Sequence, residues 1–414
     1  MTSVAVVGAG IVGLSTAWFL QEHGFDVTVV ERSHVAAGAS WGNAGWLMPG
    51  DATPLPSPET LRMGLQGLTR RGSALSIPLL AGPDLYRFLL RLARNCTAAQ
   101  WERSLQALVP LSNAALDAYD TLAAGGVSAA PTPSRYHLAC FTSVDARDEF
   151  ARYLEHLRAK GVKSEFNVMD GDAARSASPA VSGNVRGAVG LLHQRFLDPT
   201  LFVPALARSF VERGGTIEIG TEVRSLRDSG HAVELLVTRD DRPTVRRFDT
   251  VVLCTGAWLS TLARRFGVRV PVRAGRGYSF NIHTDVPIVD PIYLPEQHLA
   301  CTPMRGRLRL AGTMEFRPPS APLDQRRIRA MVEAARPMLD NVDVDDRTEE
   351  WVGPRPVSGD GMPLVGPTNS PRVWCVGGHA MEGMVLGPVT ARLAAEGIAE
   401  QRTPSTLCAF NPLR

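Results

Sequence analysis

Three glycines near the N-terminus have the spacing of a nucleotide-binding turn. Gly8, Gly10 and Gly13 follow directly on the apolar run 4–7. In such a turn the first glycine permits a sharp bend, the second lets a pyrophosphate approach the backbone, and the third allows close packing of helix and strand. Glu31 ends the next apolar run, where a carboxylate accepts hydrogen bonds from ribose hydroxyls. The triplet alone is weak evidence, but together with this acid it predicts a dinucleotide site at a helix N-terminus.

A second candidate for chemistry is Arg355, which lies between two prolines in the stretch 351–366. The stretch reads WVGPRPVSGDGMPLVG, and its prolines and glycines argue against a helix or a central strand. A guanidinium binds a carboxylate through two parallel hydrogen bonds, and a stiff backbone would hold that fork still. The residues themselves leave two interpretations open, an anchor for an anion and a solvated surface turn.

The segments that must position these residues alternate between strand and helix patterns. Strands are expected at 4–7, 25–30, 135–142, 189–196, 216–219, 223–226, 232–238, 247–253, 277–283, 308–312 and 373–376. Helices are expected at 14–23, in a long stretch over 57–122, and at 145–160, 199–213, 324–339 and from about 388. This order predicts a mixed α/β (α+β) fold with a Rossmann-type domain interleaved with a mixed-sheet domain.

Composition excludes several classes of protein. The 414 residues are 44% hydrophobic and 21% charged with a net charge of +3, and no basic patch with interleaved aromatics predicts a nucleic-acid partner. The six cysteines form no C-x-x-C pair, so we expect reduced thiols and no metal site. The apolar run 4–20 is broken by glycines and no other stretch would cross a bilayer. We expect a cytoplasmic protein with at most peripheral contact at the inner membrane face.

FAD is the dinucleotide that fits this layout. A nicotinamide enzyme normally continues with more alternating strands and helices, whereas here the small-residue segment 36–51 and a long helical stretch follow. There is no second glycine triplet of this spacing, so one dinucleotide is held and the electron chemistry is done on it. The turns 255–257 and 377–379 would meet it at the carboxyl ends of the sheet. The expected FAD-binding segments are 1–56, 197–275 and 345–414, and the substrate domain is 57–196 and 276–344 with a helical excursion.

Taken in order, these motifs resemble the D-amino-acid oxidase/dehydrogenase superfamily of FAD-dependent amine oxidoreductases. The matching segments are GAGIVG with Glu31, GASWGNAG, LCTGAW, GPRPVSGDGMPLVG and VGGHAMEGMVLGP, which span nearly the whole chain. Within the superfamily, ASWGNAGWLMPG and RGYSF are most similar to the bacterial D-amino-acid dehydrogenase branch. The chain departs from that branch at Arg276, where lysine is common, and in the loop AMEGMVL. These departures bear on the substrate and leave the chemistry unchanged.

The resemblance implies roles for individual residues. Arg355 pairs with the substrate carboxylate, and its flanking prolines preorganise it. Tyr278 is either a second contact to that carboxylate or a packed strand residue, and His379 is either a flavin contact or structural. The implied cofactor contacts are Gly8, Gly10, Ile11, Val12, Gly13, Glu31, Arg32, Ser40, Asn43, Ala44, Gly45, Leu47, Val223, Thr255, Gly256, Trp258, Gly378, His379, Gly383, Met384, Val385 and Leu386.

The implied reaction is the oxidative deamination of a D-amino acid. A hydride passes from Cα to flavin N5, and the imine hydrolyses to a 2-oxo acid and ammonia without a protein nucleophile or general base. FAD is expected to be non-covalent, because the arginine segment holds no cysteine and Cys375 lies on a buried strand. Two alternatives stay open on the same fold: a secondary-amine oxidase of sarcosine, proline or hydroxyproline type, and a biosynthetic imine-forming amine oxidase. A non-catalytic flavin-binding subunit is a third.

The expected partners follow from the same reaction. The substrate is a small amino acid or amine carboxylate, and the electron acceptor is a quinone, a dye or oxygen. Oxidases of the sarcosine type place a lysine over the flavin, whereas the only lysines here are Lys160 and Lys163, on or just beyond a surface helix. We therefore expect a dehydrogenase that prefers a quinone or dye, and a homodimer is left open.

Overall fold

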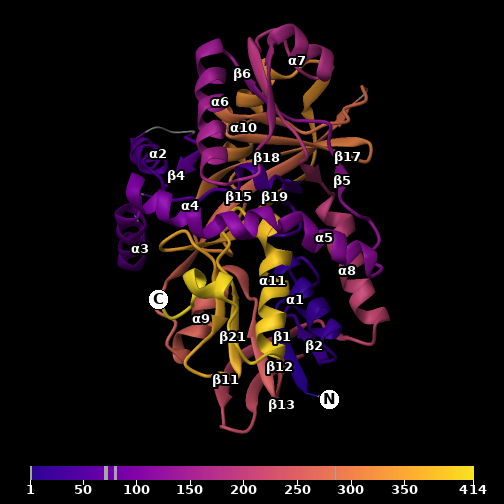
Figure 1. Cartoon of the computed structure of the whole chain (residues 1–414), viewed down its shortest axis with the longest axis vertical. Coiled ribbons are helices and arrows are strands. Elements are labelled where there is room, and N and C mark those ends of the chain that lie inside the picture. The colour runs from indigo at the N-terminus through magenta and orange to yellow at the C-terminus, as the bar shows by residue number, and fades with distance from the viewer. Residues whose placement is uncertain (1, 70–72, 79–81, 285) are drawn as a thin grey trace.

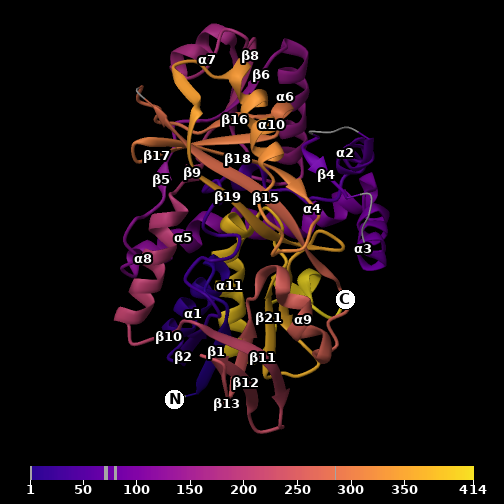
Figure 2. The ribbon, with the colours of Figure 1, turned by 180° about the vertical axis from the view of Figure 1, so that it is seen from behind.

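A computed structural model describes residues 2–69, 73–78, 82–284 and 286–414. Two large sheets form the two ends of the molecule, and the helices α4 (Ala98–Asn113) and α5 (Ala115–Ala124) run between them (Figures 1 and 2). The chain passes between the two sheets several times, so each sheet is assembled from segments far apart in the sequence. The mixed α/β fold with interleaved parts is the one expected from the sequence.

The six-stranded sheet carries the glycine turn. Its strands are β10 (Thr216–Glu218), β2 (Asp26–Val30), β1 (Ser3–Val7), β14 (Thr250–Leu253), β21 (Val373–Gly377) and β20 (Leu364–Pro367), in that spatial order. All neighbouring pairs are parallel except β20 with β21, so the carboxyl ends of five strands meet at one edge. Helices α1 (Ile11–Glu22), α8 (Pro199–Glu212) and α11 (Gly383–Ala399) share one apolar core with residues of this sheet.

A nine-stranded sheet forms the other end. Its spatial order is β19 (Val342–Ser358), β15 (Val272–Thr284), β18 (Arg307–Glu315), β17 (Leu299–Met304), β16 (Ile292–Leu294), β6 (His137–Phe141), β8 (Gly187–Leu191) and β7 (Phe166–Asp170), with β4 (Leu75–Ser76) paired to β18. The helices beside it are α6 (Val144–Ala159), α7 (Gly171–Ala177) and α10 (Gln325–Ala335). The expected segment 345–414 therefore divides, because residues 345–358 belong to this second sheet.

Smaller elements complete the chain. The strands β11 (Thr221–Asp228), β12 (Val233–Arg239) and β13 (Arg242–Phe248) form an antiparallel sheet, and β3 (Trp46–Leu47), β9 (Arg195–Phe196) and β5 (Thr132–Pro133) form another. The expected strand 189–196 is thus two strands in two sheets. The expected helical stretch 57–122 is α2 (Pro58–Thr69), α3 (Pro83–Arg94), α4 and most of α5, and residues 70–72 and 79–81 lie outside the described part. A short helix, α9 (Leu259–Ala263), follows β14.

The stretch around Arg355 is neither a helix nor a central strand, in agreement with the sequence. Its residues up to Ser358 form the regular end of β19, which pairs with β15. This strand is at the end of its sheet. The Pro356 carbonyl points away from β15 and accepts the backbone N–H of Ala380 at 3.0 Å. The prolines therefore do not remove a hydrogen bond between β19 and β15. Helix α11 begins at Gly383 and not near 388, with Pro388 inside its second turn.

Within the described residues, no helix combines the length and the apolar character needed to cross a membrane.

Candidate active site

The glycine turn has the geometry that a nucleotide needs. Gly8 has a φ of 112°, and a Cβ on Gly13 would lie 1.9 Å from the carbonyl oxygen of Gly8, so both are fixed by the protein itself. Gly10 caps α1 in an extended conformation, and a Cβ there would meet only Ser40 Oγ, at 3.2 Å. The space above Gly10 is therefore kept free of protein atoms at the N-terminus of α1, where an anionic group is favoured.

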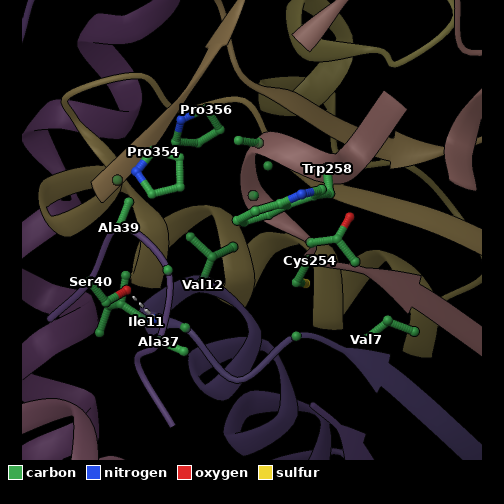
Figure 3. A pocket seen from close by; sticks show the side chains of 18 of the residues that line it. Val7, Ile11, Val12, Ala37, Ala39, Ser40, Cys254, Trp258, Pro354 and Pro356 are labelled. Carbon is green, nitrogen blue, oxygen red and sulfur yellow. Dashed lines mark hydrogen bonds between the residues drawn. The ribbon is translucent and has the colours of Figure 1, made fainter. Parts of the chain in front are cut away.

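The loop after β2 closes one side of this pocket. Ser40 Oγ accepts the N–H of Ile11 at 3.1 Å, which joins the loop to the start of α1 (Figure 3). Arg309, only 2% exposed on β18, donates to the carbonyl oxygens of Trp41 and Asn43 at 3.1 and 3.3 Å. A strand of the nine-stranded sheet thereby holds the loop that borders the nucleotide turn.

A carboxylate and a stacked pair form the far side of the pocket. Glu31 accepts the backbone N–H groups of Ala9 and Ser33, both at 2.9 Å, which fixes its carboxylate beside the glycine turn. The Arg32 guanidinium lies 3.8 Å above the ring of Trp258, which faces the pocket in Figure 3. Three residues that the sequence assigned to the cofactor therefore lie together at the end expected for the nucleoside.

Two polar atoms in the pocket wall have no partner among the described residues. One is Thr255 Oγ1, at the carboxyl end of β14, and the other is Nδ1 of His379, whose Nε2 lies 2.9 Å from Thr390 Oγ1. Burial lowers the pKa of His379 to about 4, so the ring is neutral near pH 7. Orphaned buried polar atoms, a free glycine face and a helix N-terminus in one pocket fit a large polar cofactor such as FAD.

Most of the expected cofactor residues line this pocket. Those that do are Gly8, Gly10, Ile11, Val12, Glu31, Arg32, Ser40, Asn43, Val223, Thr255, Gly256, Trp258, His379, Gly383 and Met384. Those that do not are Gly13, Ala44, Gly45, Leu47, Gly378, Val385 and Leu386. Several of the second group have a structural task; a Cβ on Gly45 would lie 2.0 Å from the Leu197 carbonyl oxygen, and Gly378 has a φ of 75° in the turn after β21.

The pocket also includes residues that sequence reasoning missed. Ser33, His34, Thr221 and Glu222 flank residues that were predicted. Pro354, Pro356, Ala380 and Met381 also line the pocket, and the two prolines flank Arg355 in the sequence; Figure 3 labels both prolines. Their only sequence signal is adjacency to a predicted contact. Tyr119 of α5 is a further missed residue, because its hydroxyl donates to the Met384 carbonyl at 2.5 Å and so fixes the first turn of α11.

Arg355 lies at the other end of the same pocket. Its Nη1 donates to the Thr313 carbonyl at 2.7 Å, and Thr313 has a φ of 52° where the register of β18 on β15 shifts. The guanidinium lies over Gly277 of β15, where a Cβ would come within 2.1 Å of Cζ. Burial lowers the pKa of Arg355 to about 10, so it stays cationic near pH 7. Among the described residues no carboxylate lies within 4.0 Å of it, so it faces the pocket as an unpaired cation.

Tyr278 does not lie in the pocket. It is fully buried in the core of the nine-stranded sheet, and its hydroxyl donates to Glu315 Oε1 at 2.7 Å. Burial, and then the hydrogen bond to Glu315 and the charge of that carboxylate, raise the pKa of Tyr278 to about 12. The same carboxylate lies 3.0 Å from Nη1 of Arg276, so the RGYSF segment supplies a buried ion pair to the sheet. Of the two interpretations of Tyr278, strand packing is the one that this geometry fits.

Replacing Tyr278 by phenylalanine should therefore weaken the fold and leave substrate binding nearly unchanged. The buried Glu315 would lose a hydrogen bond to a charged group, which costs about 1.5–3 kcal/mol of unfolding free energy. Thermal melting and the KM of the Tyr278→Phe protein test this. An unchanged melting temperature with a raised KM would return Tyr278 to the substrate site.

The fold and this pocket together define a flavin-dependent oxidoreductase, with an unpaired arginine at one end of its cofactor pocket. The chain belongs to the family described as FAD dependent oxidoreductase, whose model matches residues 3–397. This confirms the resemblance drawn from the motifs, and it confirms FAD as the cofactor. The protein is thus an FAD-dependent oxidoreductase that acts on amino acids or amines.

Individual relatives agree with this assignment. A D-amino acid dehydrogenase from Cereibacter sphaeroides is 30% identical over 412 residues, which cover 97% of this chain and 92% of that protein. Glycine oxidase from Geobacillus kaustophilus has a TM-score of 0.75 at 19% identity, covering 100% and 99% of the two chains. L-proline dehydrogenase from P. horikoshii has a TM-score of 0.71 at 16% identity, covering 100% and 97%. At such identities the two solved structures show a shared fold alone.

Proposed function

We propose that this protein oxidises a D-amino acid at its α-carbon and that Arg355 binds the α-carboxylate of that substrate. The observation that carries the proposal is the unpaired, preorganised guanidinium at one end of the cofactor pocket. The D-amino acid dehydrogenase at 30% identity supports the choice of substrate class. Because a carboxylate on Arg355 would neutralise a buried charge, such a substrate is favoured over an amine that lacks one.

In this proposal the residues of the chain orient the substrate, and none of them changes its protonation state during the reaction. Bound FAD supplies the hydride acceptor for Cα–H, and water converts the resulting imine to a 2-oxo acid and ammonia. Arg355 fixes the carboxylate through the nitrogens that its Thr313 hydrogen bond leaves free. The neutral ring of His379 cannot protonate a substrate amine at pH 7, since burial holds its pKa low. The chain's contribution in this proposal is therefore positioning.

Anaerobic stopped-flow measurement of flavin reduction tests the proposal. D-amino acids, sarcosine, D-proline and L-proline are mixed in turn with the holoenzyme, and bleaching of the flavin absorbance is followed. Rapid bleaching by primary D-amino acids is the expected result. Faster reduction by sarcosine or proline would favour a secondary-amine substrate, and no bleaching by any compound would favour a non-catalytic flavin subunit.

We expect the reduced enzyme to pass its electrons to a quinone or dye faster than to oxygen. Lys160 follows the last residue of α6 and its Nζ lies 2.8 Å from Glu102, while Lys163 is exposed, and neither lines the cofactor pocket. Their positions support a site without a lysine over the flavin. Air reoxidation of the dithionite-reduced protein, compared with reoxidation by a soluble quinone, measures the preference. Reoxidation by air that equals or exceeds the quinone rate would identify an oxidase.

A further inference from the structure

We propose that a groove lined with arginines, beside the cofactor pocket, docks the acidic surface of an electron-accepting protein. The groove has a volume of about 1610 Å³ and is lined by α3, by the segment 257–274 with α9 and the start of β15, and by residues 316–319. Figures 1 and 2 show α3 and α9 on the same side of the molecule. The proposal rests on the function proposed above only in requiring that electrons leave the flavin for an acceptor other than oxygen.

The groove concentrates positive charge. Seven arginines and one acid, Asp84, give it a charge of +6 in a protein whose net charge is +3, so the remaining residues together carry −3. Asp84 is shared by Arg87 at 3.1 Å and Arg273 at 3.8 Å. In the part of the chain that the structure describes, the other five have no carboxylate oxygen within 4.0 Å. These free groove arginines are Arg91, Arg94, Arg264, Arg269 and Arg317.

The free groove arginines come from three separate segments. Arg91 and Arg94 lie on α3, Arg264 and Arg269 follow α9, and Arg317 follows β18. A single segment rich in arginine would reflect composition alone, whereas three segments meet at one groove only through the tertiary fold. A cleft lined by one sign of charge focuses its field and attracts a partner of the opposite sign.

The groove reaches the cofactor pocket at two places. Ala257, Trp258 and Thr261 line both, so the wall between groove and pocket is there one residue thick. Ala274 of the groove lies opposite Pro356 of the pocket in the register of β15 on β19. A protein docked in the groove would thus lie close to the bound cofactor without entering its pocket. An electron, unlike a hydride, can cross such a wall.

The number of electrons favours a partner that binds and leaves quickly. Oxidation of one substrate molecule leaves two electrons on the bound flavin, and a carrier that accepts one electron takes half of them. Two carrier molecules must therefore dock in turn, while the protons held by the reduced flavin pass to water. Complementary charges speed association more than they raise affinity, which suits this exchange.

The groove fits a protein better than it fits other polyanions. Phe88 and Phe316 in its wall are only 2% exposed, so they offer no ring face on which nucleic-acid bases can stack. A bilayer surface is flat, whereas the arginines line a concave groove. Tyr86, on the outer side of α3, is 43% exposed, and tyrosine and arginine are both enriched in protein interfaces.

The test starts from the dithionite-reduced holoenzyme, so it does not depend on which substrate the protein oxidises. Three oxidised acceptors are mixed with it anaerobically: an acidic plastocyanin, the basic carrier cytochrome c, and ferricyanide as a small anion. Reoxidation of the flavin is followed by stopped-flow absorbance from low to physiological salt. Independently of turnover, calorimetric titration measures the binding of oxidised plastocyanin, phosphatidylglycerol vesicles and a DNA oligonucleotide to the oxidised holoenzyme.

Two double variants separate the groove from net charge. Arg264→Glu with Arg269→Glu, the groove variant, reverses two free groove arginines. Arg239→Glu with Arg242→Glu, the hairpin variant, makes the same change in net charge at two exposed arginines of β12 and β13, outside the groove. Flavin content and melting temperature check the folding of both.

In wild type and the hairpin variant, the rate with plastocyanin should fall as salt is raised, and the rate with cytochrome c should not. At low salt the groove variant should react with plastocyanin, and bind it, on the order of 10-fold more weakly. A plastocyanin rate that is independent of salt, or an equal loss in the hairpin variant, would overturn the proposal.

Other anions as occupants would overturn it as well. These outcomes are a groove variant that changes the rate with ferricyanide alone, and vesicles or DNA that bind through Arg264 and Arg269 while plastocyanin does not. If no amino acid bleaches the flavin, the proposed function fails, while the dithionite-reduced protein still decides the docking site.

Discussion

Replacing Arg355 by alanine should slow the reduction of the flavin by an amino acid by roughly two orders of magnitude or more. The change removes a bidentate contact to a carboxylate, and each such hydrogen bond to a charged group is worth about 1.5–3 kcal/mol. It also frees the substrate to rotate, so that the rate of hydride transfer should fall together with the affinity. The measurement is anaerobic stopped-flow reduction over a range of substrate concentrations. FAD content should stay normal, because Arg355 is bonded to Thr313 and not to the nucleotide turn.

Companion variants separate charge from geometry. Arg355→Lys keeps a cation but loses the fork, so rescue should be partial. Gly277→Ala keeps the arginine but places a Cβ where the guanidinium lies, 2.1 Å from its Cζ, and should reproduce much of the loss. Arg273→Ala removes a half-exposed arginine from β15, the strand that carries Gly277. It is the matched control and should behave as wild type.

An amine without a carboxylate should be turned over equally poorly by wild type and Arg355→Ala. Wild-type rate and affinity in Arg355→Ala would place the carboxylate elsewhere.

The parts of the site that could be predicted from the sequence are those with local constraints. Gly8, Gly13 and Glu31 belong to one strand–turn–helix–strand unit, and each is required by its immediate neighbours, so their spacing alone identifies the turn. Arg355 was found for a similar reason, since a cation between prolines is unusual. The backbone around it is a strand at the end of a sheet, which tolerates prolines that a central strand does not, so the exclusion of a helix and of a central strand was correct.

The parts that could not be predicted depend on contacts between distant segments. Tyr278 alternates on its strand like any buried aromatic, and only the placement of Glu315 beside it decides that its hydroxyl faces the core. Helix α11 begins early because Tyr119, on another helix, holds the Met384 carbonyl, and nothing near Pro388 records that contact.

Replacing Gly10 by valine should give a folded protein with little bound FAD. The backbone of Gly10 has a φ of −81° and a ψ of 179°, which any residue adopts, and a Cβ would meet only Ser40 Oγ at 3.2 Å. The valine would instead occupy the space that the pyrophosphate needs, and losing one or two charge-assisted contacts weakens binding by about 100-fold. Absorbance at the flavin bands relative to protein, after dialysis against limiting FAD, measures this loss.

Substitutions at two other glycines show whether the loss of FAD in Gly10→Val is specific to that position. In Gly13→Ala the new methyl would lie 1.9 Å from the Gly8 carbonyl oxygen, so the turn itself must shift and melting temperature and flavin content should fall together. A Cβ on Gly183 would have no described atom within 4 Å, and this glycine lies outside the pocket, so Gly183→Val should change neither quantity. Loss of flavin without loss of stability in Gly10→Val alone would mean that this glycine is kept free for the ligand. Normal flavin content in Gly10→Val would remove the pyrophosphate from the N-terminus of α1.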